Sequence, residues 1–353
     1  MVKVLRYALL VLAVCMFSRQ SHASSGTEGA SFLDIPIGAG PAALGSAYSA
    51  MASDAYAPVW NPGGLGLIDR NQFAAQHLSY LDSIHYEFAS FVHPLGYGRS
   101  LGASIQYLGS GDIAGMDIIN GNPTATGDFS SHYAAYSLAY GQKVGDKLSL
   151  GATGKVISAQ ISDVSANAYA FDLGSMYQLT KDLRLAGVLT NMGTKLTFID
   201  QGDSLPLAFH LGAVYETKYH LTVAAEGVYR QTGLASFHTG LQWAPMDPIS
   251  LRVGYKTDTL QGLSPLAGFT TGIGLNVWGF ELSYAWLPLG DLGNTNYFSF
   301  LYKFGEAAGP KRNLVHYQAV KRTESIKDTE QSDSTQHLME LLDEGETTAR
   351  ARD

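Results

Sequence analysis

Alternating apolar and polar residues form the dominant pattern in the middle of the chain. The clearest example is the segment 297–304, whose aromatic face carries Phe298, Phe300, Tyr302 and Phe304. Successive side chains of a strand point to opposite sides, so the other face of this segment is mixed. An aromatic face that ends on phenylalanine is typical of the closing strand of a bacterial outer-membrane barrel. Taken alone, the segment also fits a half-buried strand of a soluble sandwich.

About fourteen segments of this kind follow one another from residue 71 to residue 304, an even number in the range of outer-membrane barrels. We predict strands at residues 71–81, 84–93, 100–109, 130–141, 148–162, 167–178, 183–192, 207–216, 221–230, 236–243, 249–257, 268–277, 279–287 and 296–304.

The predicted connections differ in length in a regular way. Those after even-numbered strands are short, whereas those after odd-numbered strands include the long segments 110–129, 193–206, 258–267 and 288–295; the short connection near residue 82 is an exception. Bacterial barrels place short turns in the periplasm and long loops outside, and a soluble sandwich has no reason to sort its loops. The sequence therefore predicts an all-β fold, a 14-stranded antiparallel transmembrane β-barrel in the bacterial outer membrane.

The alternation also predicts which charged side chains face the lumen. The outward row is nearly free of charge, where an Arg or Lys near the midplane would cost about 2–4 kcal/mol. We expect the lumenal charges, which have both signs, to pair with each other and with the amino-terminal segment rather than to set selectivity. They are Glu226, Arg230, Arg252, Lys256 and Glu281, together with Lys155, Asp172, Arg184 and Lys303.

The two ends of the chain differ from the strand region. Residues 1–23 are predicted to be a secretory signal peptide, with Lys3 and Arg6 before an apolar run that is too short to span a bilayer. The one cysteine, Cys15, lies in this run, so the mature chain would contain none, as fits an exported protein without disulfides. Residues 305–353 are highly charged and are predicted to form a mostly disordered periplasmic tail, with one short amphipathic turn at 338–342.

Composition argues against several other classes of function. Charged residues are 15% of the chain, the net charge is −8 and there is no basic stripe, so we expect no nucleic-acid partner. The histidines lack the spacing of a metal site, and the acidic residues in 112–128 do not match a calcium loop. Gly38 and Gly40 lack the strand and helix that a nucleotide site needs. We therefore expect no enzymatic activity, no metal and no cofactor.

Residues 24–70 are rich in Ala, Gly and Ser and show little alternation, and a short helix is predicted at 42–51. This block resembles the PorV/PorQ family of outer-membrane proteins, which is similar to FadL-type transporters of hydrophobic compounds. The resemblance implies a 14-stranded barrel, residues 71–304, whose lumen holds residues 24–70 as a plug. It rests on the segments 32–40, 43–45 and 60–65 and on Asp54, and the plug motif comprises Gly40, Gly45, Asp54, Trp60, Asn61 and Pro62.

The resemblance implies two different functions. The PorV-like branch is an accessory component of protein secretion of the type IX kind, with secretion-system subunits or exported cargo as partners. The FadL-like branch is a channel for the uptake of hydrophobic small molecules such as long-chain fatty acids. The first is the main hypothesis from the sequence and the second its alternative, and outer-membrane lipid is a partner in both.

Overall fold

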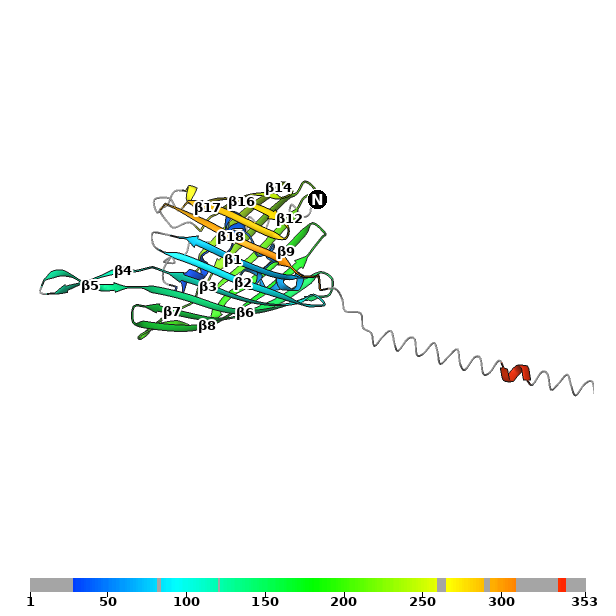
Figure 1. The fold of residues 1–353 in the computed structure, drawn as a ribbon, viewed down its shortest axis with the longest axis horizontal. Helices are drawn as coiled ribbons and strands as arrows, with labels where there is room; N and C mark the ends of the chain where they lie inside the picture. Colours follow the sequence, from blue (N-terminus) through cyan, green and yellow to red (C-terminus); the bar gives the residue numbers. More distant parts are fainter. Residues whose placement is uncertain are drawn as a thin grey trace, which may run out of the picture. The chain divides into compact units, whose positions relative to one another are not determined.

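Antiparallel strands close into a barrel in the computed structural model, which describes residues 28–80, 84–119, 121–258, 265–288, 293–308 and 336–340 (Figure 1). Residues 1–309 and 310–353 form two separate units. In the second unit the described part is a single turn of helix at 336–340, whose Leu338 and Met339 are exposed. The predicted signal peptide and most of the predicted tail lie outside the described residues.

The barrel contains fourteen strands within the described residues, and each strand pairs with its neighbour in the sequence. Its strands are β1 (Asn71–Ser79), β2 (His85–Gly96), β3 (Arg99–Gly109), β6 (Ser131–Val144), β7 (Leu148–Ile161), β8 (Val164–Gln178), β9 (Leu183–Gly193), β12 (Ala208–Glu216), β13 (Leu221–Arg230), β14 (Ala235–Met246), β15 (Ile249–Lys256), β16 (Phe269–Val277), β17 (Phe280–Pro288) and β18 (Asn294–Phe304).

The first and last strands close the sheet. β1 pairs with β18 in antiparallel register, from Asn71 opposite Phe304 to Ser79 opposite Asn296, and the two strands lie side by side in Figure 1. Closure leaves no unpaired strand edge, which would be costly in hydrocarbon. The predicted 14-stranded antiparallel barrel is thus confirmed.

Two long connections contain strands that the sequence pattern did not predict. β4 (Ile113–Ile119) and β5 (Asn122–Phe129) pair as a hairpin that extends beyond the barrel wall (Figure 1). β10 (Leu196–Phe198) and β11 (Gln201–Asp203) pair as a second, smaller hairpin before β12. The connections at 110–129 and 193–206 are long, as predicted, but each contains a hairpin that the prediction lacked. We call the end of the barrel that carries these connections the long-loop end, and the opposite end the short-turn end.

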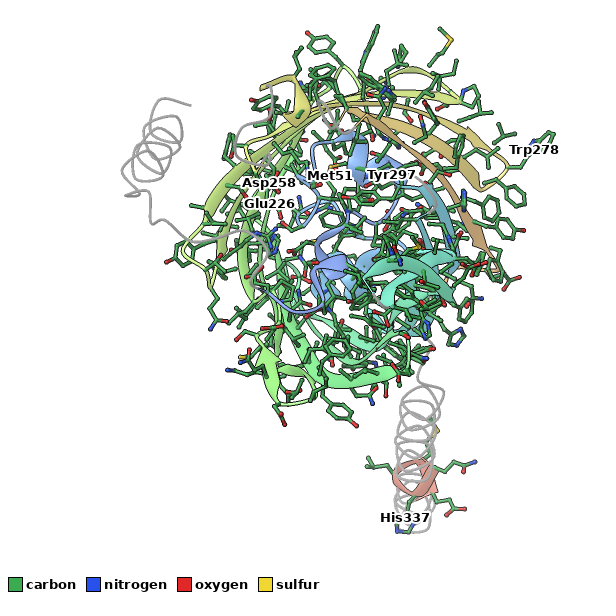
Figure 2. All side chains as sticks on the ribbon, turned by 90° about the vertical axis from the view of Figure 1, so that its left-hand side faces the viewer. Met51, Glu226, Asp258, Trp278, Tyr297 and His337 are labelled. Carbon is green, nitrogen blue, oxygen red and sulfur yellow. The ribbon has the colours of Figure 1, made fainter. Side chains whose placement is uncertain are left out.

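The outer surface of the barrel is apolar. In β6 the central residue Leu138 is 73% exposed, and in β18 Phe298 is 53% exposed whereas its neighbours Tyr297 and Ser299 are buried. Trp278, in the short turn between β16 and β17, is 92% exposed and points away from the barrel (Figure 2). An apolar belt with aromatic side chains near its borders is what a lipid bilayer requires of a barrel. Within the described residues, no helix is both long enough and apolar enough to cross a membrane.

Residues 28–70 lie inside the barrel and form the plug (Figure 2). The plug contains η1 (Ser31–Asp34), α2 (Ala39–Ala43), α3 (Ala57–Trp60) and η2 (Pro62–Leu67), and a further short helix, η3 (Pro265–Gly268), precedes β16. The predicted helix at 42–51 is wrong, because α2 ends at Ala43. Gly45 then takes a left-handed backbone conformation (φ +62°), and a Cβ at this position would lie 2.7 Å from the backbone nitrogen of Tyr255 in β15. The barrel wall thus requires glycine here and turns the chain out of the helix.

The plug spans the lumen from one end of the barrel to the other. Gly29 donates its N–H to Ser204 O (2.9 Å) in the long connection before β12. At its other end, Gly66 lies against Gln142 and Lys143, beside the short turn between β6 and β7. The plug therefore enters at the long-loop end and leaves at the short-turn end, where β1 begins.

Candidate functional site

Asn61 anchors the plug to itself and to the barrel wall. Its side chain is fully buried, and its Nδ2 donates to Ser49 O (2.8 Å) in the plug and to Ser175 O (3.1 Å) in β8. Its Oδ1 accepts the N–H of Gly63 (2.9 Å) and so caps η2. One amide thus satisfies three buried backbone groups, each of which would cost about 1–3 kcal/mol if left unpaired.

Pro62 follows Asn61 and packs directly on the wall. Gly174 of β8 faces the plug, and a Cβ there would lie 2.7 Å from Pro62 Cδ. At Gly151 of β7 a Cβ would lie 2.8 Å from Gly63 N. Real Cβ atoms do not approach so closely, so glycine on the wall is what admits the backbone of the plug.

Helix α2 is bound to the opposite side of the barrel. Ala39 donates its N–H to Ser299 Oγ in β18 (3.0 Å), and Gly45 donates its N–H to Thr270 Oγ1 in β16 (3.0 Å). Gly40 lies beside the guanidinium of Arg252, 3.1 Å from where a Cβ would be. The plug is therefore bonded to strands on both sides of the lumen.

Asp54 and Trp60 each hold a part of the plug in place. The Asp54 carboxylate accepts the hydroxyl of Tyr48 and the N–H of Tyr56 (2.9 Å). Burial raises the pKa of Asp54 above its ordinary value of 3.8, although the hydrogen bond from Tyr48 opposes the rise. Trp60 donates Nε1–H to Ile37 O (2.8 Å), and its ring meets the ring of Tyr48 edge to face, with centroids 5.7 Å apart.

Near the short-turn end, Arg252 and Glu281 form an ion pair across the wall. Arg252 Nη2 lies 2.6 Å from Glu281 Oε1. The guanidinium also donates to Gln242 Oε1 and to Ser283 Oγ, both at 2.8 Å. The cation is thus fully engaged by strands β14 and β17.

Glu226 joins the wall to the plug. This buried carboxylate accepts the N–H of Ser49 in the plug (2.9 Å) and lies 2.8 Å from His210 Nδ1 on β12. His210 was not among the predicted lumenal residues, because only charged residues were assigned to that row.

Toward the long-loop end, the remaining predicted lumenal cations have acidic partners. Arg230 lies 2.6 Å from Asp34 of η1, and Lys256 lies 3.5 Å from Asp258. Burial opposes ionisation of Asp258, but the charge of Lys256 and a hydrogen bond from His238 overcome it, so the pKa of Asp258 is lowered. A similar pair, Lys155 with Asp172 (2.7 Å), is almost completely buried.

Two cavities in the plugged lumen are lined by described residues of both the plug and the wall. The short-turn cavity, of about 130 Å³, is lined by plug residues such as Tyr48, Met51 and Asp54 and by the Arg252–Glu281 pair. The long-loop cavity, of about 80 Å³, has an apolar side made mainly by the plug and a polar side made mainly by the wall. The apolar lining is Leu33, Ile35, Pro36, Ile37, Val59, Trp60 and Val228, and the polar lining is Asp34, Ser46, Lys155, Thr190, Asn191, His210, Arg230, His238, Lys256 and Asp258.

The predicted site residues therefore belong to three places. Gly40, Asp54, Arg252 and Glu281 line the short-turn cavity, and Trp60, Arg230 and Lys256 line the long-loop cavity. Gly45, Asn61, Pro62 and Glu226 join the plug to the wall. Among the described residues, no group of three or more His, Cys, Asp or Glu side chains is placed to hold a metal ion.

The fold is similar to that of known outer-membrane channels. The toluene transporter TbuX of Ralstonia pickettii aligns with a TM-score of 0.56 at 14% identity over 76% of this chain and 98% of its own. The monoaromatic hydrocarbon channel CymD aligns with a TM-score of 0.52 at 13% identity, covering 77% of this chain and 98% of its own. A FadL homologue of Pseudomonas aeruginosa aligns with a TM-score of 0.50 at 13% identity, covering 76% of this chain and 98% of its own.

No protein-family model matches the chain, and no curated protein sequence matches it. The PorV/PorQ resemblance therefore still rests on the amino-terminal residues. The FadL-like fold is established by the structure, and a closed barrel with an apolar belt belongs in the bacterial outer membrane, as predicted.

Proposed function

We propose that this protein is a channel for the uptake of hydrophobic small molecules across the outer membrane, the alternative hypothesis from the sequence. The observation that carries the proposal is the long-loop cavity, in which the plug presents an apolar surface, including Leu33, Ile35 and Trp60, toward the outer mouth of the barrel. Seven of its described lining residues are apolar and ten are polar, so a small hydrophobic ligand could pack on the apolar surface while the polar groups orient it. The similar folds of a toluene transporter and a monoaromatic hydrocarbon channel support it.

The charges of the lumen also support a channel for uncharged or weakly polar molecules. Each of Glu226, Arg230, Arg252, Lys256 and Glu281 has a partner of opposite charge or a histidine within 3.5 Å. Paired charges create a weaker field than a lumen lined by one sign of charge, which would favour ions.

Uptake can be measured in a Gram-negative host that lacks its own long-chain fatty-acid channel. Cells that make the protein should accumulate radiolabelled oleate and toluene faster than cells with an empty vector. Val59→Asp puts a charge on the apolar side of the long-loop cavity and should abolish most of the gain, whereas Thr124→Asp on the exposed β5 strand should not. Uptake equal to the empty-vector control for both compounds would contradict the proposal.

The secretion hypothesis has one observation in its favour. In the β4–β5 hairpin, Met116, Ile118 and Ile119 are exposed beyond the barrel wall, and a two-stranded sheet can pair with an extended segment of another protein. On this second hypothesis, deleting 113–129 should reduce the export of cargo and its co-purification with the protein, while oleate uptake is kept. Normal export in cells that lack the whole protein would rule it out.

A further inference from the structure

One pair of aromatic rings joins the linings of the short-turn cavity and the long-loop cavity. Tyr48 lines the short-turn cavity, Trp60 lines the long-loop cavity, and the described linings have no residue in common. The edge-to-face contact between the two rings, at 5.7 Å and 67°, joins one lining to the other. The direct route from one cavity to the other along this contact therefore passes between the two rings.

Moving the plug backbone would break many buried bonds at once. The N–H of Gly38 donates to Gln76 Oε1 in β1, and the N–H of Ser49 donates to Glu226 in β13. Gly45 is bonded to Thr270 in β16, and Asn61 to β8. These anchors lie on strands all around the barrel, so the plug cannot leave as a body without leaving buried polar groups unpaired.

The two rings pack in the core beneath the barrel wall, but they make fewer hydrogen bonds than the backbone that carries them. The hydroxyl of Tyr48 makes one hydrogen bond, to Asp54, and Nε1 of Trp60 makes one, to Ile37 O. Neither bond is to the barrel wall. Rotation about the side-chain torsions would break these two bonds within the plug and open the contact, while the bonds between the plug and the wall stay in place.

We propose that Tyr48 and Trp60 form the gate of the channel, and that ligands pass between the cavities when these rings rotate while the plug backbone stays fixed. The passage of a hydrophobic ligand rests on the proposed function. The claim that the ring pair closes the path through the lumen does not, because it can be tested with ions alone.

The closed state can be tested by the ionic conductance of the purified protein in planar lipid bilayers. Replacing both rings, Tyr48→Ala with Trp60→Ala, should raise the single-channel conductance clearly above that of wild type, because it removes the constriction. The control is Tyr56→Ala, which removes one tyrosine ring that lines the short-turn cavity and stacks on Phe88, away from the contact. The proposal would be overturned if the conductance of the double variant were as low as that of wild type. It would also be overturned if the Tyr56→Ala control conducted as well as the double variant.

The fixed backbone can be tested with a disulfide. A Cβ at Gly212 of β12 would lie 3.4 Å from Ala50 Cβ in the plug, close to the roughly 3.5–4.5 Å found in disulfides. It would also clash with Ser49 Oγ, a hydroxyl that makes no hydrogen bond among the described residues and must rotate away. The chain has no cysteine besides Cys15 in the predicted signal peptide, so Ala50→Cys with Gly212→Cys should form one defined bond, checked by maleimide labelling. Each single cysteine variant is the control for the substitutions themselves.

With the plug locked in this way, oleate uptake should continue at an unchanged rate. Loss of uptake in the oxidised protein, restored by reductant, would overturn the fixed-backbone part of the proposal and show that the plug must move. If wild-type cells take up no oleate or toluene, the proposed function fails, and the conductance experiment still decides whether the ring pair closes the lumen.

Discussion

At the scale of single residues, a few buried polar side chains hold the irregular plug in one conformation. The plug has little regular structure, so its backbone groups need partners elsewhere. Asn61 supplies three of them and Glu226 supplies one.

We expect Asn61→Ala to loosen the plug without unfolding the barrel. The substitution leaves Ser49 O, Ser175 O and the Gly63 N–H without this partner, at a cost of about 1–3 kcal/mol for each group that finds no water. Hydrogen–deuterium exchange of plug amides should accelerate, with the strands unchanged. Ser53→Ala is the control, since that hydroxyl makes one bond of 3.3 Å within the plug; equal acceleration in both variants would show that Asn61 is not a special anchor.

A second prediction at the residue scale is that the stability of the plug depends on pH through Asp54. Its pKa is higher in the folded protein than its ordinary value of 3.8, so the folded plug binds this proton more tightly than the unfolded chain does. The protonated Asp54 therefore stabilises the folded plug most at pH values below 3.8. This stabilisation is lost as the pH rises from 3.8 through the pKa of the folded protein. As the pH is raised from about 4, amide exchange in the plug, corrected for its intrinsic pH dependence, should accelerate in wild type and less so in Asp54→Asn.

The exposed Asp69 at the end of the plug provides the control, and Asp69→Asn should behave as wild type. A pH dependence that is identical in wild type and Asp54→Asn would mean that the buried carboxyl group does not titrate in this range.

At the scale of elements, glycines on particular strands determine where the plug can lie. Gly174 on β8 faces the plug, while Gly154 on the neighbouring β7 is exposed on the outer surface, with no heavy atom within 4 Å of where its Cβ would be. The two positions therefore allow the same substitution to be compared on the two faces of one wall.

We expect Gly174→Ala to destabilise the protein and Gly154→Ala to be neutral. The new methyl group at 174 would meet Pro62 Cδ at 2.7 Å and force the plug to shift, for which overpacking typically costs about 1–3 kcal/mol. Thermal unfolding in detergent and protease cleavage within residues 28–70 can measure the effect. If Gly174→Ala melts at the wild-type temperature with an equally resistant plug, the contact is not tight in solution.

The sequence predicts the strands well because alternation is a local signal that lipid on one side and the lumen on the other impose directly. β13 has the predicted bounds, 221–230, and the other barrel strands differ at their ends by a few residues. The β4–β5 hairpin was missed because it stands clear of the wall, where no buried face requires an alternating pattern.

The site was less predictable than the strands, for a related reason. The helix expected at 42–51 fails because β15 touches the chain at Gly45, a contact between residues far apart in the sequence. The pairing of Tyr48 with Trp60 likewise depends on the path of an irregular segment that has no periodicity to read. The resemblance pointed to Trp60 and Asn61, but Tyr48 and His210 carried no signal that sequence reasoning could use.

At the scale of the whole barrel, an exposed leucine or isoleucine stabilises the protein where it faces lipid and does not where it faces water. Leu138, in the middle of β6, and Ile118, on the β4–β5 hairpin, are 73% and 74% exposed. The first lies on the barrel wall and the second beyond it (Figure 1).

We expect Leu138→Arg to destabilise the folded barrel by about 2–4 kcal/mol, as a cation near the bilayer midplane does. Ile118→Arg should have little effect, because its side chain lies in water. Urea-dependent folding into phosphatidylcholine vesicles, followed by the heat-modifiable migration of the barrel on gels, can measure both. Equal tolerance of the two substitutions would mean that the outer wall does not face acyl chains.

The path of residues 28–70 along the full length of the lumen has a consequence for biogenesis. The closed barrel has no lateral opening between its first and last strands, since β1 and β18 are paired from one end of β1 to the other. The plug is bonded to strands all around the barrel. The simplest way to enclose it is for the sheet to curve around it before the barrel closes. Pairing of β1 with β18 would then be the final step of assembly. The barrel would form around the amino-terminal segment, which would act as its template.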